Sequence, residues 1–317
     1  VYMWNDYNNN GIQELAEFEV APFPDQAKYV RVFLPNQVFV NTFQTKFSLA
    51  LTFNPMQWQN KSGIQKFLSY FYNQTSYLID QKTFRDTNFN LNPFAKEDSE
   101  LLGLNNSFMN SLFYNRGKQK HSTTYTYVES STQNLLSLGF QQARNQSHQL
   151  QYNHLVQKSW LFTVNSRTIL SESEVENYEN RNFEIKGYLV APKISYLFSK
   201  NISLDVFYEY QSKKNQFGLF ETLMQNRLGT SFTYAGEKQF TMNGEFSLYE
   251  NTFEGDALSA VGFQMLEGLQ PGRNSTWRLL VQKNLTSFLD INVNYQGRKS
   301  ETSSAIHTGN IQLRAYF

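Results

Sequence analysis

Apolar and polar residues alternate along much of the chain with a period of two, which places every second side chain on one face of a β-strand. Between Phe43 and Phe53 the odd positions are mainly apolar and the even positions mainly polar. The alternation returns at Ile202–Tyr210 and at Leu289–Gln296. These runs approach the roughly ten residues that a strand needs to cross a bilayer. The pattern therefore predicts membrane-spanning strands with one face toward lipid and one toward water.

Turns and loops also alternate in the second half of the chain. Short polar breaks fall at 158, 199–201, 235–237 and 283–284, and long polar stretches fall at 171–180, 211–220 and 251–273. Transmembrane barrels are built in this way, with short turns on the periplasmic side and long loops outside the cell.

The fold predicted from these patterns is all-β, an antiparallel transmembrane β-barrel of about 14 strands, because bacterial single-chain barrels have an even number. We expect an N-terminal segment over 1–28 and the barrel over 29–317. Strands are expected near 29–40, 43–54, 65–80, 107–116, 121–130, 146–157, 159–170, 182–198, 201–211, 221–235, 237–250, 274–283, 286–298 and 306–317, with loops near 85–106 and 131–145.

One expected strand, 182–198, changes phase at Ala191–Pro192. Apolar residues lie on odd positions before this point and on even positions after it. A β-bulge would produce such a change. The alternative is an incorrect strand assignment.

Composition narrows the class of protein. The chain is 16% aromatic and only 17% charged, its net charge is +1, and it has no cysteine. The absence of cysteine excludes a disulfide framework and thiolate metal sites. The net charge of +1 gives no electrostatic reason to expect binding to a nucleic acid. No run of about 20 apolar residues is present that would form a transmembrane helix. We therefore expect outer-membrane lipid as a partner and no nucleic acid.

The last residues, Asn310–Phe317, alternate and end on an aromatic residue. Ile311, Leu313, Ala315 and Phe317 form one row. This segment resembles the terminal strand of bacterial outer-membrane proteins, whose final aromatic residue is thought to be recognised by the barrel-assembly machinery. Gln312 departs from that pattern, because a glycine often stands there.

Four tracts extend the resemblance over most of the chain: Asp6–Gly11, Phe23–Ala27, Met265–Gly272 and Ile306–Gly309. They resemble the C-terminal β-barrel regions of large, poorly characterised outer-membrane proteins of the Bacteroidota. The resemblance implies an outer-membrane location, a barrel fold and a longer parent chain, and it implies no particular activity.

The sharpest local motif runs from Asp6 to Glu17 and matches a twelve-residue calcium loop. Such a loop needs oxygen ligands at positions 1, 3, 5, 7, 9 and 12 and a glycine at position 6. The ligands would be Asp6, Asn8, Asn10, the Ile12 carbonyl, Glu14 and Glu17. Pro22 and Pro24 would break a following helix, so we predict a structural Ca²⁺ site and not a paired sensor. The alternative is an Asn-rich turn without metal.

Histidine and serine positions do not form a recognisable catalytic set. His148 and His154 would share one face of a strand, but no acidic cluster accompanies them. His307 is near Ser303 and Ser304 without an orienting base. We expect no catalytic residue, no enzymatic activity and no bound organic cofactor.

Two further features have more than one interpretation. Aromatic residues such as Trp58, Trp160 and Tyr196 fit interfacial girdles better than a sugar-binding surface. The stretch 251–273 contains both glycines and apolar residues. It would fold into the lumen, present a docking surface, or pack on itself as an extracellular hairpin.

These observations favour a non-enzymatic barrel that acts as a scaffold or subunit of an outer-membrane transport, secretion or assembly complex. Other outer-membrane or periplasmic proteins would be its partners. The main alternative is a diffusion pore for small solutes. A third class, an outer-membrane hydrolase, would need a catalytic constellation that the sequence does not reveal.

Overall fold

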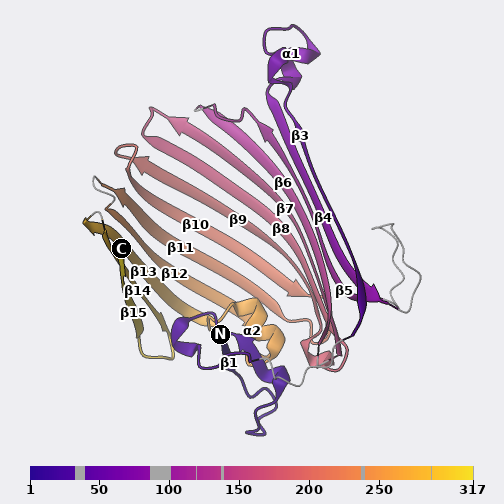
Figure 1. Ribbon diagram of the computed structural model, residues 1–317. Helices are drawn as coiled ribbons and strands as arrows, with labels where there is room; N and C mark the ends of the chain where they lie inside the picture. The colour runs from indigo at the N-terminus through magenta and orange to yellow at the C-terminus, as the bar shows by residue number, and fades with distance from the viewer. Residues whose placement is uncertain are drawn as a thin grey trace.

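The computed structural model describes residues 1–32, 40–85, 101–118, 120–136, 139–236, 240–286 and 288–316. Thirteen strands form one antiparallel sheet in which each strand pairs with its neighbours in the chain. Figure 1 shows this sheet as a broad, curved wall with β3 at one margin and β15 at the other. The predicted all-β, antiparallel fold is confirmed, with thirteen paired strands in the described residues where about 14 were expected.

The strands of the sheet are β3 (Thr42–Phe53), β4 (Phe71–Phe84), β5 (Leu101–Tyr114), β6 (His121–Leu136), β7 (Gly139–Val156), β8 (Trp160–Val175), β9 (Phe183–Leu197), β10 (Ile202–Asn215), β11 (Thr222–Ala235), β12 (Thr241–Glu254), β13 (Gly272–Thr286), β14 (Leu289–Ser300) and β15 (Ile306–Ala315). A separate pair, β1 (Tyr2–Trp4) and β2 (Phe18–Val20), belongs to the N-terminal segment. The helices are α1 (Ile64–Leu68) and α2 (Ala260–Leu266), with 3₁₀ turns at Leu15–Glu17, Pro24–Gln26, Pro55–Trp58 and Glu179–Arg181. Among the described residues, no helix has the length and apolar character required to span a membrane.

Strand register brings the apolar residues of successive strands onto one face of the sheet. Leu204 pairs with Tyr196 on one side and with Phe232 on the other. Exposed members of this apolar face include Leu49, Leu51, Leu112, Leu150, Phe162, Val164, Val190, Ile194, Leu204, Val206, Leu228, Phe246, Leu248, Ile311 and Leu313. The opposite face, here called the inner face, is mainly polar and includes the buried Thr163, Ser195, Gln225 and Ser247. This division is what a membrane-spanning barrel requires.

The two ends of the sheet differ in the length of their connections. At one end, short links join β7 to β8, β9 to β10, β11 to β12 and β13 to β14. At the other end, the connections from β8 to β9, from β10 to β11 and from β12 to β13 are longer and include the 3₁₀ turn Glu179–Arg181 and the helix α2. The N-terminal segment lies at this long-loop end, whereas α1 projects from the short-turn end (Figure 1). The predicted alternation of turns and loops is therefore present in the second half of the chain.

Several predictions for the first half were wrong in their boundaries. Residues 64–68 are helical, so the strand predicted at 65–80 begins only at Phe71. Residues 101–106 and most of 131–145 belong to strands and not to loops, because their alternation is carried by Asn, Gln, Ser and Thr, which also read as loop residues.

The predicted strand at 29–40 is not seen in its described part, where Tyr29 makes only an isolated bridge to Tyr2. Positions 33–39 lie outside the described residues, as does the terminal Phe317.

The β-bulge predicted at Ala191–Pro192 is absent. β9 keeps one register with β8 from Phe183 to Tyr196, with Pro192 opposite Val164. The apparent phase change has another cause: Ile185 is an apolar residue on the inner face, where α2 covers it. The apolar Ile185 is required for packing against α2, and its position in the sequence looked like a change of register.

Candidate functional site

The connection between β12 and β13 folds back over the inner face at the long-loop end. Its helix α2 begins after Ser259, whose hydroxyl accepts a hydrogen bond from the Gly262 amide at 2.9 Å. A Cβ at Gly262 would lie 2.3 Å from the Asp256 carbonyl oxygen, so only glycine permits this close approach. Glu267 ends the helix in the left-handed conformation, with φ of 54°.

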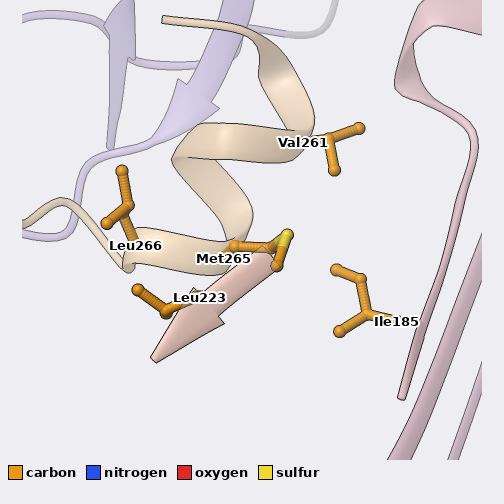
Figure 2. Close-up of a cluster of buried hydrophobic side chains, with 5 residues drawn as sticks. All are labelled: Ile185, Leu223, Val261, Met265 and Leu266. Atoms are coloured by element: carbon orange, nitrogen blue, oxygen red, sulfur yellow. The ribbon is translucent and has the colours of Figure 1, made fainter. Parts of the chain in front are cut away.

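An apolar cluster holds α2 against the sheet. Val261, Met265 and Leu266 of α2 pack with Ile185 of β9 and Leu223 of β11, and all five are buried. Figure 2 shows the Met265 side chain of α2 between those of Leu223 and Ile185. Of the three arrangements considered for 251–273, the structure shows folding onto the inner face.

A buried lysine reinforces this attachment. The Nζ of Lys213, on β10, donates hydrogen bonds to the Met265 carbonyl at 3.1 Å and to the Glu267 carboxylate at 2.5 Å. The Lys213 side chain is only 6% exposed. A buried ammonium group must be paired, so the end of α2 is fixed to the inner face by both packing and charge.

The N-terminal segment is fastened beside α2 by two arginines from the sheet. Arg298 of β14 forms a bidentate ion pair with Asp25, one of whose contacts is 2.8 Å, and its guanidinium lies 4.1 Å from the centroid of the Phe23 ring. Arg181, in the connection between β8 and β9, pairs with Glu19 at 2.7 Å and donates to the Ala16 carbonyl. A Cβ at Gly268 would lie 2.4 Å from Pro22, which shows how closely the segment meets the connection after α2.

Electrostatics at these two contacts differ. Hydrogen bonding to Arg298 lowers the pKa of Asp25 below its usual range, against a smaller opposing effect of burial. Burial raises the pKa of Glu19, and Arg181 only partly offsets this effect. Burial also raises the pKa of Tyr7, whose hydroxyl donates to Glu19 at 3.1 Å. The Arg298–Asp25 contact therefore favours the charged carboxylate more clearly than the Arg181–Glu19 contact does.

A cavity of about 490 Å³ lies beneath Pro22, Phe23 and Leu269. Side chains from strands β8 to β15 line it, which identifies the polar face as the concave one. Its charged lining residues are Arg167, Glu209, Arg227, Glu245, Glu267, Arg278 and Arg298. We call the N-terminal segment (1–28) together with α2 the cap, because both lie over this charged hollow.

The calcium-like loop forms a compact turn within the cap. The Asp6 carboxylate accepts hydrogen bonds from the Asn10 and Gly11 amides at 3.1 and 2.8 Å. Asn8 and Asn10 both donate side-chain hydrogen bonds to the Glu14 carboxylate. Gly11 has a φ of 71°, as the sharp turn requires. The structure therefore brings Asp6, Asn8, Asn10 and Glu14 together.

Two predicted calcium ligands are placed differently. Glu17 is only 2% exposed, and its carboxylate accepts from the Trp4 indole at 2.7 Å and the Tyr7 amide at 3.2 Å. Ile12 is an exposed residue. In the described part of the chain, no group of three or more His, Cys, Asp or Glu residues has a metal-binding arrangement. The Ca²⁺ site stays a prediction based on the sequence and the loop geometry.

Three histidines of the sheet contact tyrosine hydroxyls, whereas His121 of β6 is opposite His154 and contacts the Asn115 side-chain amide at 2.8 Å. His148 contacts the Tyr125 hydroxyl at 2.8 Å and His154 contacts the Tyr152 hydroxyl at 3.1 Å. His307 contacts the Tyr295 hydroxyl at 2.8 Å. These pairs lie on the apolar face, where each imidazole finds a polar partner.

The predicted aromatic girdle has a local counterpart at the short-turn end. Trp160 and Tyr196 have ring centroids 4.7 Å apart, and Tyr196 and Phe198 are 4.6 Å apart. Trp160 is the first residue of β8, Tyr196 is next to the last residue of β9, and Phe198 follows β9 directly, so all three lie at the short-turn end. This position suits the membrane interface.

Sequence reasoning missed the residues that attach the cap. Arg298, Asp25, Arg181, Glu19 and Lys213 pair across separations that local patterns do not reveal. The helix α2 had a signal, because Ser259 is a good N-cap and Val261 and Met265 have helical spacing.

Comparison with known proteins gives limited information. No known family model matches the chain, and no curated protein matches it. The crystal structure of the β domain of the Bordetella autotransporter BrkA has 9% identity and a TM-score of 0.29, covering 78% of this chain and 92% of that one. The transport unit of the autotransporter AIDA-I from Escherichia coli has 9% identity and a TM-score of 0.31, covering 90% and 93%. These scores carry no inference about function.

Proposed function

We propose that the chain forms the wall of a capped outer-membrane β-barrel, which acts as a non-enzymatic scaffold or subunit of a transport, secretion or assembly complex. The chain lies in the outer membrane, with its apolar face against lipid. The observation that carries the role is the cap, which is attached to the inner face by the α2 cluster, by Lys213 and by Arg298. A covered hollow suits protein contacts better than free diffusion.

We also propose that this wall is the C-terminal barrel region of a large Bacteroidota protein. The four sequence tracts described above support this assignment. Residues 1–28 are then part of the cap and contribute to its outer surface, which is available to other outer-membrane or periplasmic proteins.

Gentle detergent extraction from native outer membranes, followed by mass spectrometry, tests the proposed role. We expect defined proteins to co-purify in stoichiometric amounts, and to be lost when the cap is detached by Arg298→Met with Lys213→Met. A matched control is Arg314→Met, which removes an exposed charge from β15 away from the cap. Purification of a monomer without partners would contradict the complex.

The second candidate, a diffusion pore, is favoured by the charged hollow of about 490 Å³. A pore would conduct ions in a planar bilayer. We expect the wild-type protein to conduct poorly and the variant with a detached cap to conduct better. High conductance of the wild type, unchanged in the variant, would favour the pore and would show that the cap does not restrict passage.

For the N-terminal loop we propose a structural Ca²⁺ site. Hard oxygen donors are the ligands that Ca²⁺ prefers, and the loop gathers those of Asp6, Asn8, Asn10 and Glu14. The motif also assigns the Ile12 carbonyl and Glu17, and Glu17 would have to turn from the Trp4 indole toward the ion. Bound Ca²⁺ would neutralise the carboxylates and stiffen the cap.

Calorimetric titration of the purified protein with CaCl₂ tests the site. We expect binding in the wild type and its loss in Asp6→Ala with Glu17→Ala. Because Glu17 also holds Trp4, the milder Asp6→Asn is measured as well and is expected to weaken binding. Gln13→Ala changes a residue outside the ligand set and should bind as the wild type does. No heat from the wild type would remove the proposal.

A further inference from the structure

The two margins of the sheet are open to pairing. Within the described residues, β3 pairs only with β4 and β15 pairs only with β14. Figure 1 shows these strands at opposite margins of the curved wall. The apolar face nevertheless continues to both margins, where Leu51 is 55% and Ile311 is 69% exposed. Both margins therefore lie at the depth of the hydrocarbon.

A margin at that depth has to be paired. Unsatisfied backbone N–H and C=O groups in hydrocarbon cost several kcal/mol each, so an open sheet edge does not face lipid. Three solutions are conceivable: direct pairing of β3 with β15, pairing with a second copy of the chain, or pairing with further strands.

Strand direction decides among these solutions. Every neighbouring pair from β3 to β15 is antiparallel, and the row has thirteen strands, so β3 and β15 run in the same direction. Direct closure would make a parallel pair. A second copy with the same orientation in the membrane would also meet these margins in parallel. An odd number of additional strands restores antiparallel pairing at both margins and gives the even total of bacterial barrels.

The two strands that meet β3 and β15 must both run from the short-turn end to the long-loop end. Val1 lies at the long-loop end, because β1 pairs with β2 in the cap there. A strand leading into Val1 from the short-turn end would have this direction. The Arg298–Asp25 contact holds the N-terminal segment beside β14, the strand adjacent to β15.

We propose that an odd number of antiparallel strands, formed by residues that precede Val1 in a longer polypeptide, bridges β15 and β3 and closes the barrel. This inference rests on the proposed membrane location. The segment 1–28 is then a long connection at the loop end between a preceding strand and β3. The strand beside β15 should place apolar residues next to Ile311 and Leu313 and polar residues next to Gln312.

Photo-crosslinking in native outer membranes tests this proposal. Benzoylphenylalanine replaces Gln312 on β15 of the full natural polypeptide, and the adduct is identified by mass spectrometry. We expect an adduct with a peptide that precedes Val1. The matched control carries the same group at Asn292 on β14, directly opposite Gln312 and away from the cap, and should react with β13 and β15 only, because both neighbours are known.

Each other outcome at position 312 overturns the proposal. An adduct with β3 would show direct closure, one with a different protein would show a partner strand, and one with lipid alone would show an open margin. Crosslinks between β15 and a second, isotopically labelled copy would show a dimer.

Engineered disulfides give a second readout, because residues 1–317 contain no cysteine. Asn294→Cys with Asn310→Cys joins directly opposed positions of β14 and β15 and should form a disulfide. Ala50→Cys with Gln312→Cys tests direct closure and should not form one, nor should Ser48→Cys or Thr52→Cys with Gln312→Cys. Failure of the proposed location is seen separately, as absence of the protein from the outer-membrane fraction.

Discussion

Leu223 and Leu228 lie on the same strand, β11, yet their surroundings are opposite. Leu223 is on the inner face and is completely buried beneath α2. Leu228 is on the apolar face and is 53% exposed. The same side chain is therefore covered by protein in one place and left for lipid in the other, and the five-residue separation accounts for the difference because neighbouring positions alternate between faces.

The comparison shows why the two faces respond differently to mutation. Around Leu223 the packing partners are fixed side chains, so a smaller residue leaves a cavity. Lipid chains around Leu228 are mobile and fill a lost volume. A substitution that introduces a charge should cost more on the apolar face than on the inner face, because hydrocarbon cannot solvate a charge whereas the inner face is lined with polar groups.

The largest effect is expected from Leu223→Ala. Removing a buried leucine costs about 2–5 kcal/mol, and here the loss falls on the attachment of α2. Hydrogen exchange at residues 260–266 should therefore become faster. Leu228→Ala is the matched control and should leave this exchange unchanged. Equal exchange in both variants would mean that the cluster does not hold α2.

A charge on the apolar face should have the next largest effect. Arginine at the bilayer midplane destabilises a barrel by about 2–4 kcal/mol, and less toward the interfaces. We expect Leu228→Arg to lower the unfolding free energy in lipid vesicles, as measured by denaturant titration. Ser231→Arg places the same charge on the inner face of the same strand and should cost little. A reversed order would show that the faces have been assigned incorrectly.

The smallest effect concerns the attachment of the cap through Arg298. Pairing with Arg298 lowers the folded-state pKa of Asp25. The ion pair therefore stabilises the cap fully at pH values above about 3.9, the pKa of an aspartate in the unfolded chain. The stabilisation of the cap by this ion pair is lost as the pH falls through the lowered pKa of folded-state Asp25. Arg298→Met should increase protease cleavage within 1–28 at neutral pH.

At low pH, Arg298→Met and the wild type should be cleaved within 1–28 at the same rate, because protonated Asp25 no longer forms an ion pair with the guanidinium of Arg298. Glu19 is present in both proteins, so the opposite shift of its pKa cancels in the comparison. A difference that persists unchanged at low pH would mean that the Phe23 contact, and not the ion pair, holds the segment.

Prediction from sequence succeeded best where the local pattern and the environment coincide. The strand at 43–54 was predicted within a residue or two because both faces of it alternate cleanly. The strands β6 and β7 were predicted too short because their inner and outer positions are both rich in Asn, Gln, Ser and Thr. Such strands are held by backbone hydrogen bonds to their neighbours, and their side-chain polarity does not distinguish them from loops.

The candidate site divides in the same way. The calcium-like loop was recognisable because all of its predicted ligands lie within twelve consecutive residues, as the motif requires. The ion pair between Asp25 and Arg298 joins residues 273 positions apart, and no local pattern carries that information.

Alternation of residue types along the chain indicated strands with an apolar face, because both follow from a repeat of two residues. The lengths of the polar breaks between them indicated hairpins and the sides on which turns and loops lie. Folding in three dimensions decided that α2 and residues 1–28 cover the inner face and that β3 and β15 run in the same direction. These features depend on which distant segments meet and on how many strands lie between them. A local repeat contains neither quantity.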